Sequence, residues 1–172
     1  FGSKALYTPT IYRLAATGVR FSPMYSPSAI CSASRAVLMT GRFPARAGVP
    51  GNVSSSKGAA GMPTAEMTLA ELMKSNGYAT GHIGKWHLGW KSEFSPAAHG
   101  FDYFFGFKSG YTDYWQHTDG VGQPDLFEND RPVEVAGYMT DLITERSVQF
   151  IERNAQRPFF IDVAYNAAHW PY

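Results

Sequence analysis

The sequence predicts an α/β domain in which helices cover both faces of a mainly parallel sheet. Helix signals alternate with short apolar strand signals, and each repeated unit runs from a helix into a strand. Such helix-then-strand units are typical of parallel sheets with covered faces. The 172 residues, 44% of them hydrophobic and 17% charged, suffice for one well-buried core.

The first two units carry clear helix boundaries. In the first, Thr8-Pro9 provides an N-cap and a proline at the first helical position, Gly18 ends the helix, and residues 19–21 follow as a predicted strand. The second begins with the capping box 68–71, and its helix stops at Asn76-Gly77 before a short strand over residues 78–84. Both units thus run from a helix into a strand.

A third unit joins a longer helix to an apolar strand over residues 158–165. Residues 51–61, rich in Gly, Ser and Ala, are expected to form a mobile loop. The aromatic, glycine-containing segment 101–115 follows neither the helical nor the strand period, and it is a candidate wall of a pocket. The residues expected on the buried face of the helix are Met139, Leu142, Ile143, Phe150 and Ile151.

Composition excludes several classes of function. Fifteen Lys and Arg against fourteen Asp and Glu leave a formal charge of +1, which predicts no nucleic-acid partner and no attraction to an anionic membrane. No stretch reaches the roughly 18 apolar residues of a membrane helix, and residues 1–7 lack a secretory signal pattern. The single cysteine, Cys31, excludes an internal disulfide and a multi-cysteine metal site.

Polar side chains follow two of the predicted strands. Ligands of parallel sheets gather outside the carboxyl ends of the strands. Lys85 and His87 follow the strand at 78–84, and Asn166 and His169 follow the strand at 158–165. We therefore expect these two groups to contribute to one site.

Cys31 lies at or near the start of a helix-compatible run that ends at Gly41. A helix N-terminus offers unpaired amides and partial positive charge, which stabilise an anion or a thiolate, and Arg35 lies one turn further along the same face. From these residues alone, a thiolate nucleophile of the kind used by phosphatases and proteases stays possible.

Longer strings carry a resemblance to type I sulfatases. Cys31-Ser32-Ala33-Ser34-Arg35, followed by Thr40-Gly41-Arg42, resembles the signature C-x-[P/A]-x-R with its downstream T-G-R. Residues 84–89 read G-K-W-H-L-G, which matches the second signature without departure. Pro158-Phe159-Phe160 followed by N-x-x-H-x-P at 166–171 is similar to a third. H-G-F-D-x-F-F-G at 99–106 also matches and is interpreted as structural.

The resemblance implies an alkaline-phosphatase-like α/β/α sandwich with a mainly parallel sheet, incomplete in this chain. Residues 1–172 would then be part of the N-terminal sulfatase catalytic domain, truncated at both ends. The implied activity is that of an arylsulfatase-like sulfuric ester hydrolase. Periplasmic, secreted or lysosomal locations are favoured over the cytoplasm by the same resemblance.

The resemblance also assigns roles to five residues. Cys31 would be oxidised to formylglycine by a formylglycine-generating enzyme, and its hydrated aldehyde would attack sulfur. Arg35 would support the charge on that hydroxyl, and Lys85 would bind the sulfate oxygens. His87 would act as the base that expels sulfate, and His169 would contact the ester oxygen and help protonate the leaving alcohol.

The implied site also contains a calcium ion or another divalent cation. Cys31, as formylglycine, would be its one ligand in this chain, and the other ligands would lie outside the chain. The substrate would be a sulfated small molecule or a sulfated sugar. One departure is Ala33, which replaces the commoner proline and predicts less efficient conversion of Cys31.

Two alternatives stay open at the sequence level. The first alternative to a sulfatase is a noncatalytic fragment or pseudoenzyme that binds sulfated ligands, and the second is a phosphate or phosphonate ester hydrolase of the same superfamily. We expect little or no activity from the 172 residues alone. Three histidines, His82, His99 and His117, are interpreted as packed and hydrogen-bonded rather than catalytic, while Ser109 and His117 are weaker candidates for a substrate pocket.

Overall fold

The computed structural model describes residues 4–171. Within this range one five-stranded sheet has the order β4-β3-β2-β1-β5. β1 pairs in parallel with both β2 and β5, whereas β2-β3 and β3-β4 are antiparallel. The strands are β1 (Ala79–Lys85), β2 (Tyr103–Phe107), β3 (Phe127–Glu128), β4 (Arg131–Pro132) and β5 (Phe159–Ala164).

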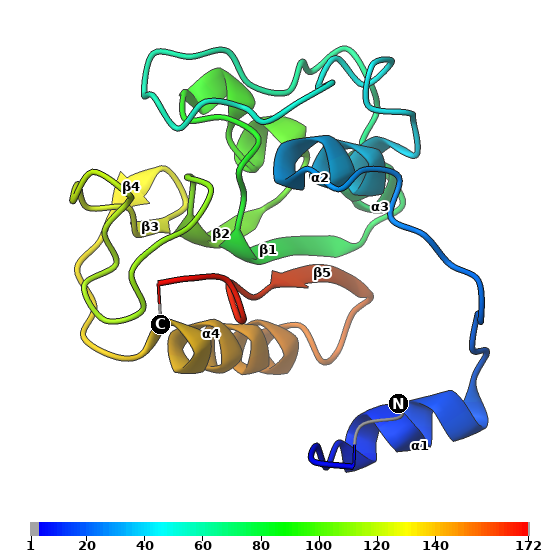
Figure 1. The fold of residues 1–172 in the computed structure, drawn as a ribbon. Coiled ribbons are helices and arrows are strands. Elements are labelled where there is room, and N and C mark those ends of the chain that lie inside the picture. The colour runs from blue at the N-terminus through cyan, green and yellow to red at the C-terminus, as the bar shows by residue number, and fades with distance from the viewer. Residues whose placement is uncertain (1–3, 172) are drawn as a thin grey trace.

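Helices lie on both sides of this sheet (Figure 1). α4 covers one face, and α2 and α3 lie on the other, which confirms the predicted three-layer α/β/α arrangement with a mainly parallel sheet. The α-helices are α1 (Pro9–Thr17), α2 (Cys31–Thr40), α3 (Leu69–Ser75) and α4 (Met139–Arg153), and short 3-10 turns are η1 (Ser92–Phe94) and η2 (Ala97–His99).

Alternating side chains of the central strands divide the core into two clusters. On β2, Phe104 belongs to a cluster with Trp86, whereas Phe105 belongs to a cluster with Ile143 of α4. Successive strand residues point to opposite faces, so adjacent phenylalanines serve different layers. The aromatic segment 101–115, which follows neither the helical nor the strand period, therefore contains a strand that is largely buried between the layers.

Several predicted boundaries are confirmed. The capping box forms at α3, where the Thr68 side chain accepts from the Glu71 amide and the Glu71 carboxylate accepts from the Thr68 amide. The predicted strands at 78–84 and 158–165 correspond to β1 and β5. α4 buries four of the five residues expected on its face, whereas Ile151 is 40% exposed although its neighbour Phe150 is buried.

The strand predicted at residues 19–21 is wrong. These residues are exposed and irregular, and no described strand pairs with them. α1 forms as predicted but buries none of its residues, and Figure 1 shows it apart from the three layers. A segment becomes a strand only when a neighbouring strand pairs with it, so strand propensity alone does not determine its structure.

The loop predicted at residues 51–61 is irregular in the structure. Among residues 4–171, none of the helices combines the length and the apolar character needed to span a bilayer.

Gly84 is a point where the three parallel strands tolerate no side chain. Its φ is +117°, and a Cβ there would lie 2.0 Å from the Ala164 carbonyl oxygen of β5. We expect Gly84→Ala to destabilise the domain by roughly 2–4 kcal/mol through backbone strain and overpacking. Gly58→Ala, where a Cβ meets nothing within 4 Å, is the matched control. Urea unfolding midpoints measure both; equal midpoints would contradict the prediction.

Candidate active site

The residues that start α2 place Cys31 at the edge of a cavity. Ile30 is extended, with φ −102° and ψ 133°, and the helix begins at Cys31, as predicted. Gly41 ends the helix in the left-handed conformation at φ 66°. Ser32, Ala33 and the other inward residues are buried, so the helix is fixed by packing, while the Cys31 side chain is half-buried beside a cavity of about 1040 Å³.

Arg35 ties this helix to the end of β1. Its Nη1 donates to the Lys85 carbonyl oxygen at 2.6 Å. Burial lowers the pKa of Arg35, while the charges of Asp162 and Cys31 act in the opposite direction. An arginine keeps its charge even when such burial lowers its pKa, so the cavity wall contains a fixed cation.

Lys85 is the last residue of β1 and only 5% exposed. Its pKa is lowered, first by burial and then by the charge of Arg35, while Cys31 acts in the opposite direction. Cys31, Arg35 and Lys85 all line the same cavity. The structure thus brings together three of the five residues predicted from the sequence, and two of them are cations facing one thiol.

His82 and Asp162 form a partly buried pair, and Asp162 lines this cavity. His82 Nδ1 lies 2.9 Å from Asp162 Oδ2, and His82 Nε2 lies 3.0 Å from the Lys85 carbonyl oxygen. Burial acts to raise the pKa of Asp162, but the hydrogen bond from His82 and the charges of His82 and Arg35 outweigh it and lower the pKa. His82 is therefore a packed, hydrogen-bonded residue, as the sequence suggested.

His87 is held by the loop that follows α2. Its backbone has φ 53°, its Nε2 lies 3.2 Å from the Val53 carbonyl oxygen, and its own carbonyl accepts from Ser32 Oγ at 2.8 Å. Because a carbonyl only accepts, Nε2 carries the proton and Nδ1 carries the lone pair. That Nδ1 is buried and has no partner among the described residues.

The electrostatic surroundings keep His87 neutral. Burial, followed by the charges of Lys85 and Arg35, lowers its pKa to about 4, and His169 contributes in the same direction, while the Val53 carbonyl opposes them. A neutral imidazole with a free lone pair can accept a proton at neutral pH.

His169 approaches from the loop after β5. Its carbonyl accepts from the Tyr114 hydroxyl at 2.9 Å, and its ring stacks on Tyr111 with centroids 5.7 Å apart. His169 Nδ1 lies 2.7 Å from the Trp170 carbonyl oxygen, which leaves Nε2 as the outward nitrogen. His169 does not line the cavity beside Cys31, so the structure does not bring this predicted residue to the thiol.

Sequence reasoning missed several supporting residues. Asp162 is the one carboxylate in an otherwise apolar strand, and this position could have identified it as a supporting residue of the site. Asn52 accepts from the Ser32 amide at 3.2 Å, and the Val53 amide donates to Ser32 Oγ at 3.0 Å. This strap between residues 52–53 and α2 depends on long-range contacts, which no local pattern indicates. Of the two weaker pocket candidates, Ser109 lines a cavity of about 430 Å³ with Ser54 and Tyr111.

The remaining weaker candidates stay apart from Cys31. His117 is buried, with Nε2 3.0 Å from the Gly137 carbonyl oxygen, and it lines a separate pocket near β3. His99 is fully buried against Trp86, as expected, but neither of its ring nitrogens has a hydrogen-bond partner among the described residues, so the expected hydrogen bonding is wrong. No group of three His, Cys, Asp or Glu side chains arranged to hold a metal ion occurs within residues 4–171.

Comparison with known proteins gives the family of this chain. The model of the Sulfatase family matches residues 1–172. The chain belongs to the sulfatase family.

Individual relatives agree with this assignment. The chain is 35% identical to the uncharacterized sulfatase YdeN of Escherichia coli over 95% of its length. It is 37% identical to an arylsulfatase of Hemicentrotus pulcherrimus over 92% of its length. It is 32% identical to human N-acetylgalactosamine-6-sulfatase over 99% of its length. The matches cover 32%, 32% and 36% of those proteins, so the chain spans about a third of the curated relatives.

Solved structures share the architecture. The crystal structure of Ps i-CgsB superposes with a TM-score of 0.91 at 34% identity, over 99% of this chain and 42% of that one. A protein solved with its substrate D-glucosamine-2-N,6-O-disulfate superposes with a TM-score of 0.77 at 30% identity, over 98% of this chain and 31% of that one. The expected fold class is thereby confirmed.

The position of His87 between two cations predicts its titration. In the folded protein His87 should stay neutral as the pH falls to about 4 and become protonated only below that value. In urea-unfolded protein the same residue should titrate near ~6.5. Two-bond ¹H–¹⁵N spectra of the imidazoles across this pH range measure both midpoints. A folded midpoint near that of the unfolded chain would contradict the described burial.

Proposed function

We propose that this chain forms the sulfate-handling part of a sulfuric ester hydrolase that cleaves a sulfate monoester through a formylglycine derived from Cys31. One observation carries the proposal: Cys31, at the start of α2, lines the same cavity as the two cations Arg35 and Lys85. Family membership supports hydrolysis of a sulfate ester as the reaction.

The electrostatics of the cavity favour an oxyanion. Arg35 and Lys85 repel each other in a buried setting, and Asp162, the acid nearest to them, is already bonded to His82. A sulfate ester placed between the two cations would relieve that repulsion, because charge-assisted hydrogen bonds strengthen away from water. The site is thus suited to binding a tetrahedral anion beside residue 31.

The roles of the chain's own residues follow from their atoms. When formed, formylglycine supplies a hydrated aldehyde whose hydroxyl attacks sulfur. Arg35 and Lys85 would bind the charge on the nucleophile and on the sulfate oxygens. Nδ1 of His87 would accept the proton of the remaining hydroxyl as sulfate leaves. His169, when protonated, would donate from Nε2 to the oxygen of the departing alcohol, which takes up that proton.

Residue 31 fits this modification, since its side chain is half-buried and borders the cavity. The implied calcium ion fits the described residues less well. Asp162 is bonded to His82, and residues 4–171 bring no further carboxylate to Cys31. A divalent ion would therefore need oxygen ligands from elsewhere.

The substrate class we propose is a sulfated sugar. A similar protein was solved with k-i-k-neocarrahexaose, and another with D-glucosamine-2-N,6-O-disulfate as its substrate. The second candidate function for the 172 residues by themselves is binding of sulfated ligands without turnover. It is favoured by the lack of a metal-ligand cluster among residues 4–171.

The first test examines Cys31 itself. Protein from the native source should yield a peptide around residue 31 whose mass corresponds to an aldehyde in place of the CH₂–SH group. Cys31→Ala should abolish hydrolysis of an aryl sulfate by that protein in the presence of calcium. An unmodified thiol would exclude the formylglycine mechanism. Faster cleavage of the phosphate ester of the same aryl alcohol would favour a phosphatase instead.

The second test examines the anion site independently of turnover. Lys85→Ala removes a buried cation that faces Cys31, so the Kd for inorganic sulfate should rise about 10- to 100-fold, as expected for a lost hydrogen bond to a charged group. Lys91→Ala is the matched control, because Lys91 is exposed and pairs only loosely with Glu93 at 4.0 Å. Calorimetric titration with sulfate measures both; equal affinities in the two variants would remove Lys85 from the site.

A further inference from the structure

A short turn after β2 contacts both imidazoles that the proposed reaction uses. We call residues 108–111 the β2 turn. Gly110 lies so close to His87 that a Cβ at this position would be 2.9 Å from His87 Cε1. Its neighbour Tyr111 stacks on His169 with an interplanar angle of 10°. Two successive residues of one turn therefore border the two histidines.

A single buried carboxylate holds this turn in place. Asp125 is fully buried, and its Oδ1 accepts from the Lys108 amide at 2.9 Å. Its Oδ2 accepts from the Ser109 amide at 3.0 Å and also from Ser109 Oγ. Both carboxylate oxygens are thus used on two successive residues of the β2 turn, immediately before Gly110 and Tyr111.

Asp125 is itself held by the neighbouring segments. Its amide donates to the His117 carbonyl at 2.9 Å. Burial raises the pKa of Asp125 to about 6, against the opposing hydrogen bonds from Ser109 and Lys108. A buried carboxylate needs its full set of hydrogen-bond donors. Removing the carboxylate would leave the Lys108 and Ser109 amides buried and unpaired.

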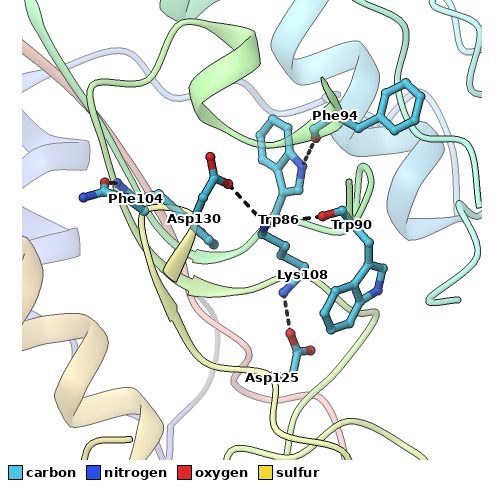
Figure 2. Close-up of polar contacts among 8 residues, drawn as sticks. Trp86, Trp90, Phe94, Phe104, Lys108, Asp125 and Asp130 are labelled. Carbon is cyan, nitrogen blue, oxygen red and sulfur yellow. Dashed lines mark hydrogen bonds and ion pairs between the residues drawn. The ribbon is translucent and has the colours of Figure 1, made fainter. Parts of the chain in front are cut away.

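The Lys108 side chain fixes the other side of the turn (Figure 2). Nζ lies 3.4 Å from the Trp90 carbonyl oxygen and 3.3 Å from Asp130 Oδ1, and 4.7 Å from the centre of the Phe127 ring. Figure 2 shows Lys108 between Asp130 and Asp125, so its ammonium and its amide bind different acids. Asp130 contacts only the end of this side chain, which makes it a natural control.

We propose that Asp125 is a positioning residue for the sulfatase reaction: through the β2 turn, it fixes the places of the His87 and His169 rings. The inference rests on the proposed function for its catalytic meaning. Asp125 touches neither Cys31 nor the cavity beside it. Its effect is transmitted by Gly110 against one imidazole and Tyr111 against the other.

Imidazole NMR spectra of Asp125→Ala, Asp125→Asn and Asp130→Asn test the inference without turnover. In Asp125→Ala, the His87 and His169 ring signals should shift, while those of His82, bonded to Asp162 across the sheet, should stay in place. Asp125→Asn keeps one acceptor oxygen and should shift them less. Asp130→Asn should leave all three rings unchanged.

Two outcomes would overturn the positioning role. The first is unchanged His87 and His169 signals in a folded Asp125→Ala protein. The second is collapse of the His82 signal together with the others in both Asp125 variants, which would make Asp125 a residue of general stability.

Kinetics with an aryl sulfate provide the second measurement. Asp125→Ala should lower kcat by about 10- to 100-fold, with KM changed little, because misplacing a catalytic group by an ångström has effects of this order. Asp125→Asn should recover part of the loss. An equal loss of kcat in Asp130→Asn would contradict the inference. These kinetics use protein from the native source; if its unsubstituted form has no turnover, the proposed function fails, whereas the NMR result still decides whether Asp125 positions the rings.

Discussion

The carbonyl oxygen of Lys85 joins the parts of this site. It accepts from Arg35 of α2 and lies within hydrogen-bonding distance of His82, whose other ring nitrogen contacts Asp162 of β5. One backbone acceptor at the end of β1 therefore links the helix that presents Cys31, the central strand and the edge strand. Because the acceptor belongs to the backbone, a substitution of the Lys85 side chain leaves this junction in place while changing the charge of the cavity.

This junction also concentrates positive charge where water is scarce. Arg35 must be buried to reach the Lys85 carbonyl. The Lys85 side chain lies near Arg35 because Lys85 itself supplies this acceptor. The cost of burying two cations is offset only when an anion joins them. After burial, the charges of the same two cations are the main causes that lower the pKa of His87. The cations suited to binding an anion thus also help to keep the imidazole lone pair free.

Much of the fold was predictable because its signals are local. The capping box at Thr68, the apolar face of α4 and the start of α2 at Cys31 each follow from residues within a few positions. β2 was not predicted, because it is buried on both faces and shows no alternation. The strand expected at residues 19–21 does not form, because these residues have strand propensity but no described strand pairs with them.

The sequence by itself determined the chemical identities at the site: a cysteine at a helix start, an arginine one turn later, and Lys85, His87 and His169 just after strand ends. Only the tertiary structure decided which atoms meet. The shared cavity of Cys31, Arg35 and Lys85, the tautomer of His87 and the hold of Asp125 on the β2 turn all depend on residues far apart in the chain. Such contacts depend on how the layers pack, and local residue patterns carry no record of that packing.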